Sequence, residues 1–94
     1  MSVSGWRIAE RDAVQKAIEH APLQVREKYE FWKARIEDEG PLGVRTWKGF
    51  RDHALKGEWS GHRSSYLNEK YRVIYRFDVR GRMVLVDHVC PHDY

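Results

Sequence analysis

The sequence predicts an α+β fold, in which an N-terminal helical hairpin covers one face of a small twisted antiparallel sheet. Apolar residues recur at helical spacing in the first half of the chain, whereas in the second half they alternate with polar residues at a period of two. The length of 94 residues suffices for one hydrophobic core and is too short for two independent folds. We therefore expect residues 1–94 to form a single domain.

The first predicted helix covers residues 12–20, with Asp12 as a candidate N-cap. Pro22 breaks this helix, and a second, longer helix follows over residues 23–39. The apolar residues of the second helix recur at i, i+4, i+7 and i+11, and they are Val25, Tyr29, Trp32 and Ile36. This spacing predicts a helix with one buried stripe, which the glycines and proline of "EGPLG" end. Residues 5–10, before both helices, are either a short strand or an irregular lead-in.

Three antiparallel strands are predicted over residues 59–67, 71–79 and 83–90. In the central strand, alternation places one set of side chains under the helices and the other on the uncovered face. The covered set is Val73, Tyr75 and Phe77, and the uncovered set is Arg72, Ile74 and Arg76. In the last strand His88 has the parity of Val84 and Val86, which predicts a half-buried, structural histidine.

The long connection over residues 44–61, "VRTWKGFRDHALKGEWSG", contains three glycines. Connections of this length in a compact domain are often functional. The charge distribution draws attention to the same half of the chain. The net charge is +3, and the whole surplus lies in residues 48–94, where nine Lys and Arg face six Asp and Glu. A modest basic surface there is compatible with a phosphate-bearing partner.

The composition indicates a cytoplasmic protein. No apolar run is long enough to span a bilayer, and the first ten residues lack the pattern of a secretory signal. The single cysteine, Cys90, cannot form a disulfide within the chain, which agrees with a reducing compartment.

The last seven residues, "HVCPHDY", are metal ligands, an active-site tail or an accident of composition. On an extended strand, positions i, i+2 and i+4 span roughly 13 Å, so His88, Cys90 and His92 cannot share one ion there unless Pro91 bends the chain. No other metal motif supports such a site. We therefore expect neither a metal nor another cofactor.

RNA cleavage without a metal needs a base for the 2′-hydroxyl, cations for the phosphate and an acid for the leaving 5′-oxygen. The second half of the chain holds residues for each role, with aromatic residues between them that could stack on bases. Composition alone favours the simpler alternative, in which the aromatic residues are core and the cations are solvated.

The order of these residues makes the RNA reading specific. "GFRDHALKGEWSGHRSSYLNEKYRVIYRF", followed by "VLVDHVCPHDY", resembles the RelE/ParE superfamily of type II toxin-antitoxin toxins. The resemblance is to its mRNA interferases, the RelE/StbE, YafQ, YoeB and HigB groups. It covers roughly residues 42–94, preceded by a helical hairpin of suitable size. It implies a RelE-like microbial RNase fold and an mRNA endoribonuclease that inhibits translation.

Carried over residue by residue, the resemblance implies catalytic roles for His53, Arg72, His92, Asp93 and Tyr94. Its implied RNA- and phosphate-binding residues are Arg63, Lys56, Lys70, Tyr66, Trp59, His62 and Arg76. We expect Arg72 and Arg63 to bind the scissile phosphate together on the uncovered face of the sheet. His53 or His92 takes the 2′-proton, the other protonates the leaving oxygen, and Tyr94 stacks or positions the substrate. Lys70 and Tyr71 replace an Asp-Trp pair of YafQ, and Ser65 replaces a lysine of RelE, so the division of labour differs in this chain.

The implied partners are a cognate antitoxin that wraps and inhibits the toxin, mRNA, and the ribosomal A site. Operator DNA would be contacted only through the antitoxin, and no membrane is involved. Two alternatives stay open: a ParE-like inhibitor of DNA gyrase, and a module that still binds its antitoxin but has lost catalysis.

Overall fold

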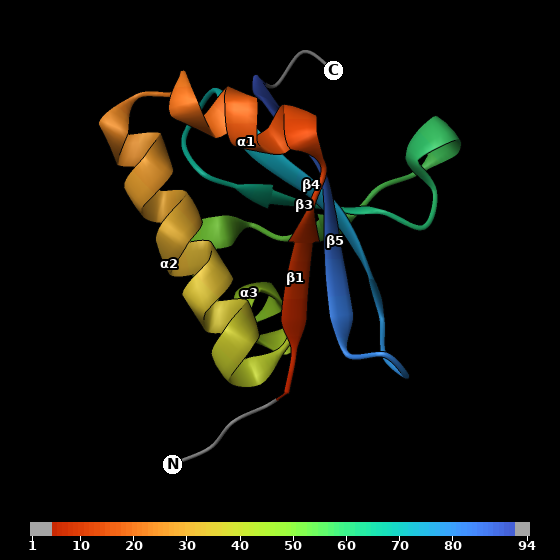
Figure 1. Ribbon diagram of the computed structural model, residues 1–94. Helices are drawn as coiled ribbons and strands as arrows, with labels where there is room; N and C mark the ends of the chain where they lie inside the picture. The colour runs from red at the N-terminus through yellow and green to blue at the C-terminus, as the bar shows by residue number, and fades with distance from the viewer. Residues whose placement is uncertain (1–4, 92–94) are drawn as a thin grey trace.

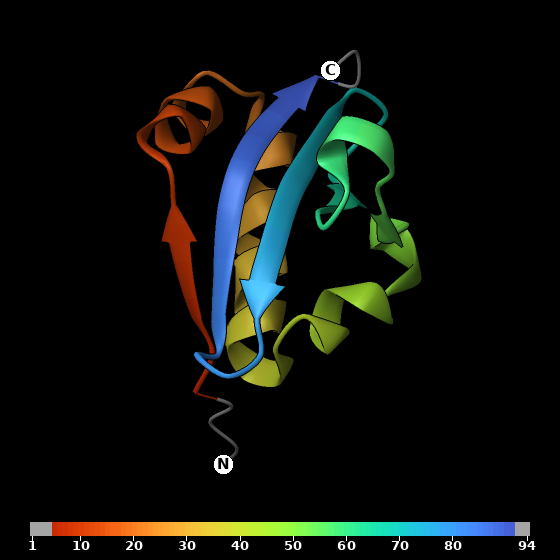
Figure 2. The same cartoon turned by 90° about the vertical axis from the view of Figure 1, so that its right-hand side faces the viewer.

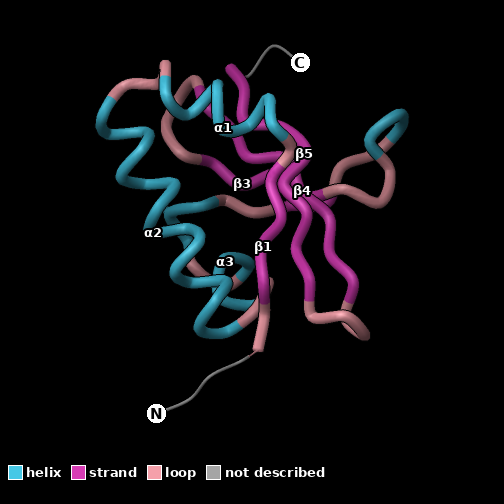
Figure 3. Tube along the Cα trace, in the orientation of Figure 1, coloured by secondary structure: helices cyan, strands magenta, loops and turns pink. Residues whose placement is uncertain are grey.

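A computed structural model describes residues 5–91, with three helices and two short 3-10 turns arranged around a five-stranded sheet (Figure 1). The helices are α1 (Asp12–Glu19), α2 (Leu23–Glu39) and α3 (Leu42–Arg45), and the 3-10 turns are Lys48–Phe50 and Gly57–Trp59. The strands are β1 (Arg7–Glu10), β2 (His53–Ala54), β3 (Arg63–Tyr66), β4 (Tyr71–Asp78) and β5 (Met83–Pro91). The predicted α+β class is confirmed, and Figure 3 shows α2 and α3 on one side of the strands.

Helix α2 has the predicted bounds, because a proline precedes it and a glycine ends it. Pro22 precedes its first turn, and Gly40 ends it with a φ of 73°. A Cβ atom on Gly40 would lie 2.5 Å from the indole nitrogen of Trp6, so only glycine fits there. All four residues of the predicted apolar stripe are buried. Helix α2 therefore forms the main cover of the sheet.

Helix α1 begins at Asp12, but the predicted N-cap is wrong. The cap residue is Arg11, which makes no side-chain capping hydrogen bond, and Asp12 lies in the first turn. A carboxylate in the first turn still interacts favourably with the helix dipole. The axis of α1 runs across one end of the sheet, crosswise to α2, instead of antiparallel beside it (Figure 1).

The sheet has the strand order β1-β5-β4-β3-β2 and is mixed. The lead-in left undecided by sequence is strand β1, which pairs in parallel with β5, whereas β3, β4 and β5 are antiparallel as predicted. Strand β2, which was not predicted, pairs antiparallel with β3. Strand β3 begins at Arg63 and not at residue 59, because residues 57–59 form a 3-10 turn. At the other end of the chain, β5 continues to Pro91, which pairs with Tyr71.

A β-bulge in β5 reverses the predicted orientation of His88. Tyr75 pairs with Val86 and Ile74 pairs with His88, so that Asp87 is an additional residue between the two pairs. The extra residue shifts the alternation of side chains by one. The prediction that His88 shares the face of Val84 and Val86 is therefore wrong, and His88 is exposed on the opposite face.

The core lies between α2 and the sheet, and its largest fully buried side chains are aromatic. Trp32 stacks on Tyr29 with ring centroids 5.8 Å apart and meets Tyr75 edge-on at 5.2 Å. All three rings are fully buried or nearly so. Burying side chains of this size contributes about 2–3 kcal/mol each. The predicted covered set is confirmed, since Val73 and Tyr75 belong to the core and Phe77 packs against it.

Candidate functional site

The register defines the side chains on the face of the sheet that α2 does not cover, which we call the open face. Figure 2 looks onto it, with β4 and β5 in front of α2 and residues 55–62 looping out beside them. From β2 to β5 the open face carries His53, Ser64, Tyr66, Arg72, Ile74, Arg76, Leu85, His88 and Cys90. The predicted uncovered set of β4 is thus confirmed. Cationic and titratable side chains gather here.

Arg72 is fixed at the beginning of β4. Its Nη1 donates to the carbonyl oxygens of Asn68 at 2.7 Å and Tyr71 at 3.2 Å, and its guanidinium carbon lies 4.5 Å from the centroid of the Tyr66 ring. Arg51 contacts the same ring, at 4.8 Å. Among the described residues, neither guanidinium forms an ion pair with a carboxylate. An anion would therefore meet two cations whose charge no described carboxylate neutralises.

His53 lies exposed on β2, and its tautomer follows from one hydrogen bond. The Nδ1 atom lies 2.9 Å from the carbonyl oxygen of Arg51. A carbonyl can only accept, so Nδ1 carries the proton and Nε2 of the neutral ring keeps its lone pair. An exposed imidazole with a fixed tautomer has the form that a general base requires.

Asp52, between Arg51 and His53 in the sequence, anchors this segment to the sheet. Its side chain is fully buried and accepts hydrogen bonds of 2.6 Å from Arg63 Nε, Ser65 Oγ and Tyr75 Oη. Burial of the Tyr75 phenol, reinforced by the Asp52 carboxylate, raises the pKa of Tyr75 far above its ordinary value. The phenol therefore remains protonated and remains a donor to Asp52.

Arg63 is not on the face where we predicted it. It pairs with Tyr75, so its side chain shares the covered face, and its Nε is engaged by Asp52. Burial by itself lowers the pKa of Arg63, but the hydrogen bond and charge of Asp52 outweigh burial and raise it. The prediction that Arg63 and Arg72 act side by side on one face is wrong. Arg63 lies on the same face as its partner Tyr75, and Tyr75 and Arg72 point to opposite faces of the sheet.

Asp87, the residue inserted by the bulge, forms a second buried carboxylate cluster. It accepts from Arg11 Nε at 2.7 Å, lies 2.9 Å from His62 Nε2 and 3.4 Å from Arg76 Nε. Burial tends to raise the pKa of Asp87, but the hydrogen bond from Arg11 and the charges of Arg76, Arg11 and His62 lower it overall. Asp87 is therefore ionised at neutral pH and links β5 to α1 and to the loop that carries His62.

Trp59 holds the loop of residues 55–62 against the open face. Its ring meets His88 edge-on at 5.1 Å and His62 edge-on at 5.4 Å. Ile74 pairs with His88 and is fully buried although it points away from the core. The Trp59 loop lies on that side of the sheet and closes part of the open face.

The other predicted site residues are distributed around this face. Lys56 and Lys70 are exposed, in the loop and in the β3–β4 turn, and Arg76 is half-exposed at the far end of β4. The predicted catalytic residues His92, Asp93 and Tyr94 lie outside the described residues. Pro91 pairs with Tyr71, the neighbour of Arg72, so β5 leads to this end of the sheet.

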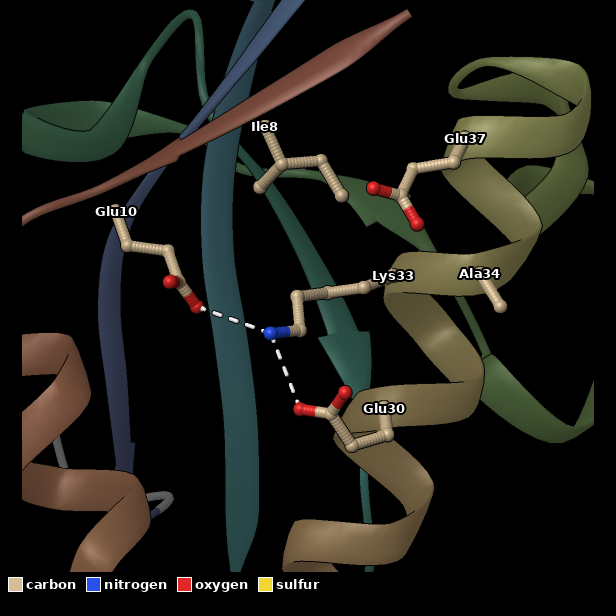
Figure 4. Close-up of a pocket in the computed structure, with 6 residues that line it drawn as sticks. All are labelled: Ile8, Glu10, Glu30, Lys33, Ala34 and Glu37. Atoms are coloured by element: carbon tan, nitrogen blue, oxygen red, sulfur yellow. Dashed lines mark ion pairs between the residues drawn. The ribbon is translucent and has the colours of Figure 1, made fainter. Parts of the chain in front are cut away.

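A separate cleft lies on the covered side, between the edge strand β1 and α2, with a volume of about 290 Å³ (Figure 4). It is lined by Ile8, Glu10, Glu30, Lys33, Ala34 and Glu37. Lys33 bridges Glu30 at 3.0 Å and Glu10 at 3.6 Å. Three carboxylates against one ammonium do not suit a phosphate, so the candidate site remains the open face.

Sequence reasoning missed three residues of the site: Arg51, Asp52 and Asp87. Arg51 and Asp52 directly precede His53 in "FRDHA", and this proximity to a predicted catalytic residue was the available signal. Asp87 gave no signal, because its position depends on the bulge. Within residues 5–91 no cluster of three metal-ligand side chains is present, and no helix there is sufficiently long and apolar to cross a membrane.

Comparison with known proteins gives a fold but no sequence family. No family model matches the chain, and no curated protein matches its sequence significantly. Solved structures match over nearly the whole chain. YafQ from E. coli strain BL21(DE3) has a TM-score of 0.73 and 15% identity, covering 93% of each chain. The chain has the RelE-like fold.

Two further structures extend this result. The archaeal RelE–RelB complex from Pyrococcus horikoshii OT3 gives a TM-score of 0.75 at 22% identity, covering 95% of this chain and 97% of the matched one. The YoeB/ParE toxin from Agrobacterium tumefaciens gives 0.73 at 16% identity, covering 92% and 98%. The resemblance predicted from "DHALKGEWSGHR" and "YRVIY" is therefore confirmed at the level of the RelE-like fold.

Proposed function

We propose that this chain is the toxin of a type II toxin-antitoxin system and acts as a metal-independent mRNA endoribonuclease. The observation that carries the proposal is that His53 and Arg72 both lie on the open face. His53 presents an Nε2 lone pair, and Arg72 presents a guanidinium that no described carboxylate neutralises. The RelE-like fold supports this reading independently of that geometry.

In the proposed reaction Arg72 binds the scissile phosphate and Nε2 of His53 takes the proton of the 2′-hydroxyl. The 2′-oxygen attacks phosphorus, the bond to the 5′-oxygen breaks, and an acid protonates that leaving oxygen. His92 is the proposed acid, with Asp93 and Tyr94 positioning it and the substrate. His88, which the bulge turns onto the same face, is an alternative acid. The products are a 2′,3′-cyclic phosphate and a 5′-hydroxyl end.

The supporting residues have distinct proposed tasks. Trp59 and His62 offer ring surface beside the RNA strand, while Lys56, Lys70 and Arg76 contribute positive charge to its path. YafQ has been crystallised as a DinJ–YafQ toxin-antitoxin complex, and YoeB as a YoeB–YefM complex. We propose that this chain is cytoplasmic and has an antitoxin of its own, an acidic protein that covers the open face and contacts operator DNA in its place.

The test is an in-vitro translation reaction with purified, antitoxin-free protein, followed by analysis of the mRNA ends. We expect cleavage of ribosome-bound mRNA with 5′-hydroxyl ends, which accept phosphate from a kinase without prior dephosphorylation. His53→Ala and Arg72→Ala should lower the cleavage rate at least 100-fold, whereas Arg26→Ala, on the exposed side of α2, should leave it unchanged. Ends carrying a 5′-phosphate, or full activity of Arg72→Ala, would contradict the mechanism.

The same preparation separates the alternative functions. Inhibition of gyrase in a plasmid supercoiling assay, with translation unaffected, would identify a ParE-like activity. Antitoxin binding without either effect, and without growth arrest on induction, would identify a module that has lost catalysis.

A further inference from the structure

Arg51 is unusual both in its backbone and in its side-chain contact. Its φ of 44° and ψ of 41° place a non-glycine residue in the left-handed region, at the end of the 3-10 turn Lys48–Phe50. Glycine or asparagine ordinarily occupies such a position, because a Cβ atom makes it unfavourable. Arg82, in the β4–β5 turn, is the other non-glycine residue with positive φ within residues 5–91.

Arg51 is held in place by the contacts of the residues around it. Asp52 is held inside by three donors, which prevents the segment from turning over. The carbonyl of Arg51 orients His53, and its guanidinium lies on the ring of Tyr66. The residue therefore connects the proposed base with the ring that also supports Arg72.

The guanidinium groups of Arg51 and Arg72 both contact the ring of Tyr66, an arrangement that favours binding of an anion. Their carbons lie 4.5 and 4.8 Å from the same centroid, and the two like charges held at one ring repel each other. The ring face offsets part of this repulsion through cation–π attraction, and no described carboxylate contributes. A polyanion with successive phosphates along one strand would neutralise both groups at once.

We propose that Arg51 is a second phosphate-binding residue, and that Arg51, Tyr66 and Arg72 form a clamp for neighbouring phosphates of one RNA strand. The inference rests on the proposed function for the identity of the strand, and it adds Arg51 to the binding residues. It also changes the role of Tyr66: its ring is the platform that positions two cations, instead of a surface on which a base stacks. Arg51 thereby fixes the strand on the side of the scissile phosphate that faces His53.

The experiment measures binding separately from cleavage. A fluorescently labelled RNA in which every 2′-hydroxyl is methylated cannot undergo 2′-attack, and its affinity is followed by anisotropy over a series of salt concentrations. We expect Arg51→Ala to weaken binding about tenfold and to make the salt dependence shallower by about 0.7 in log–log slope, the effect of one lost phosphate contact. Arg51→Lys should recover part of the affinity. Tyr66→Leu should weaken binding more than Tyr66→Phe, because phenylalanine keeps the ring face.

Two control variants separate charge and strain from the clamp. Arg26→Ala removes an exposed arginine from α2, and Arg82→Gly relieves a positive φ away from Tyr66; both should bind the RNA as the wild type does. Arg51→Gly should weaken binding without lowering the melting temperature, because glycine accepts the left-handed backbone. Loss of RNA affinity with an unchanged melting temperature would show that the Arg51 side chain serves binding and not folding.

The outcomes distinguish this inference from the proposed function. If the wild type cleaves mRNA and Arg51→Ala binds with unchanged affinity and salt slope, the clamp is wrong and the nuclease remains. If the wild type binds the methylated RNA through Arg51 but cleaves no mRNA, the clamp stands and the nuclease is wrong. Absence of any salt-dependent RNA binding by the wild type would overturn the clamp.

Discussion

The two buried carboxylates, Asp52 and Asp87, stabilise opposite faces of the same sheet in different ways. The Asp52 side chain is fully buried and accepts from one cation and two hydroxyl groups, Ser65 and Tyr75. The Asp87 side chain, 5% exposed, is surrounded by two arginines, of which Arg11 is 51% and Arg76 48% exposed, and by His62. One cluster lies in the core, whereas the other opens to solvent.

The two clusters therefore differ in how strongly solvent weakens them. Interactions in the core are protected from ions, whereas exposed pairs are screened by salt and contribute little. The Asp52 cluster fixes the segment 51–53 and so orients Arg51 and His53 from behind. The Asp87 cluster instead includes solvent-exposed charges, and its strength should depend on pH and salt.

The largest effect is expected for Asp52→Ala. This substitution leaves the Arg63 guanidinium and two hydroxyl groups without their acceptor, which should lower the free energy of unfolding by about 3–5 kcal/mol. Urea denaturation followed by circular dichroism measures it. Asp52→Asn keeps the shape and one acceptor oxygen, so it should lose distinctly less. A loss below about 1 kcal/mol in the alanine variant would refute the anchoring role.

An intermediate and pH-dependent effect is expected for Asp87→Asn. The lowered pKa of Asp87 means that its ionised form stabilises the fold at pH values above its ordinary pKa of 3.8, and that this contribution disappears as the pH falls through the folded-state value. At pH 7 the variant should be less stable by about 1–2 kcal/mol. The difference from the wild type should shrink towards pH 3 when unfolding is measured across that range. A constant difference would contradict the ionic origin.

The smallest effect is expected for Arg76→Ala, because its pair with Asp87 is long and half-exposed. The loss should be about 0.5 kcal/mol and should vanish in 1 M salt. Arg63→Ala, its counterpart in the Asp52 cluster, should cost more and retain its cost in salt. Equal costs for the two arginines in urea denaturation would remove the distinction between the clusters.

Much of the fold was predictable because its signals are local. The bounds of α2 follow from Pro22, Gly40 and a regular apolar stripe, and all of these act within a few residues. The faces of β4 follow equally from simple alternation. The parallel pairing of β1 and the crosswise course of α1 depend on contacts between distant segments, which no local pattern specifies.

The features of the candidate site also fall into those set by local sequence and those set by contacts between distant segments. Its residue types, their order and the parity of Arg72 were determined by the sequence alone, since alternation along an uninterrupted strand is fixed by backbone geometry. Tertiary structure decided that the bulge at Asp87 turns His88 outward and that Arg63 faces the core. It also decided that Arg51 and Arg72 contact the same ring, that of Tyr66. One inserted residue reverses every later side chain in a strand, and contacts between residues far apart in sequence form only when the whole sheet assembles.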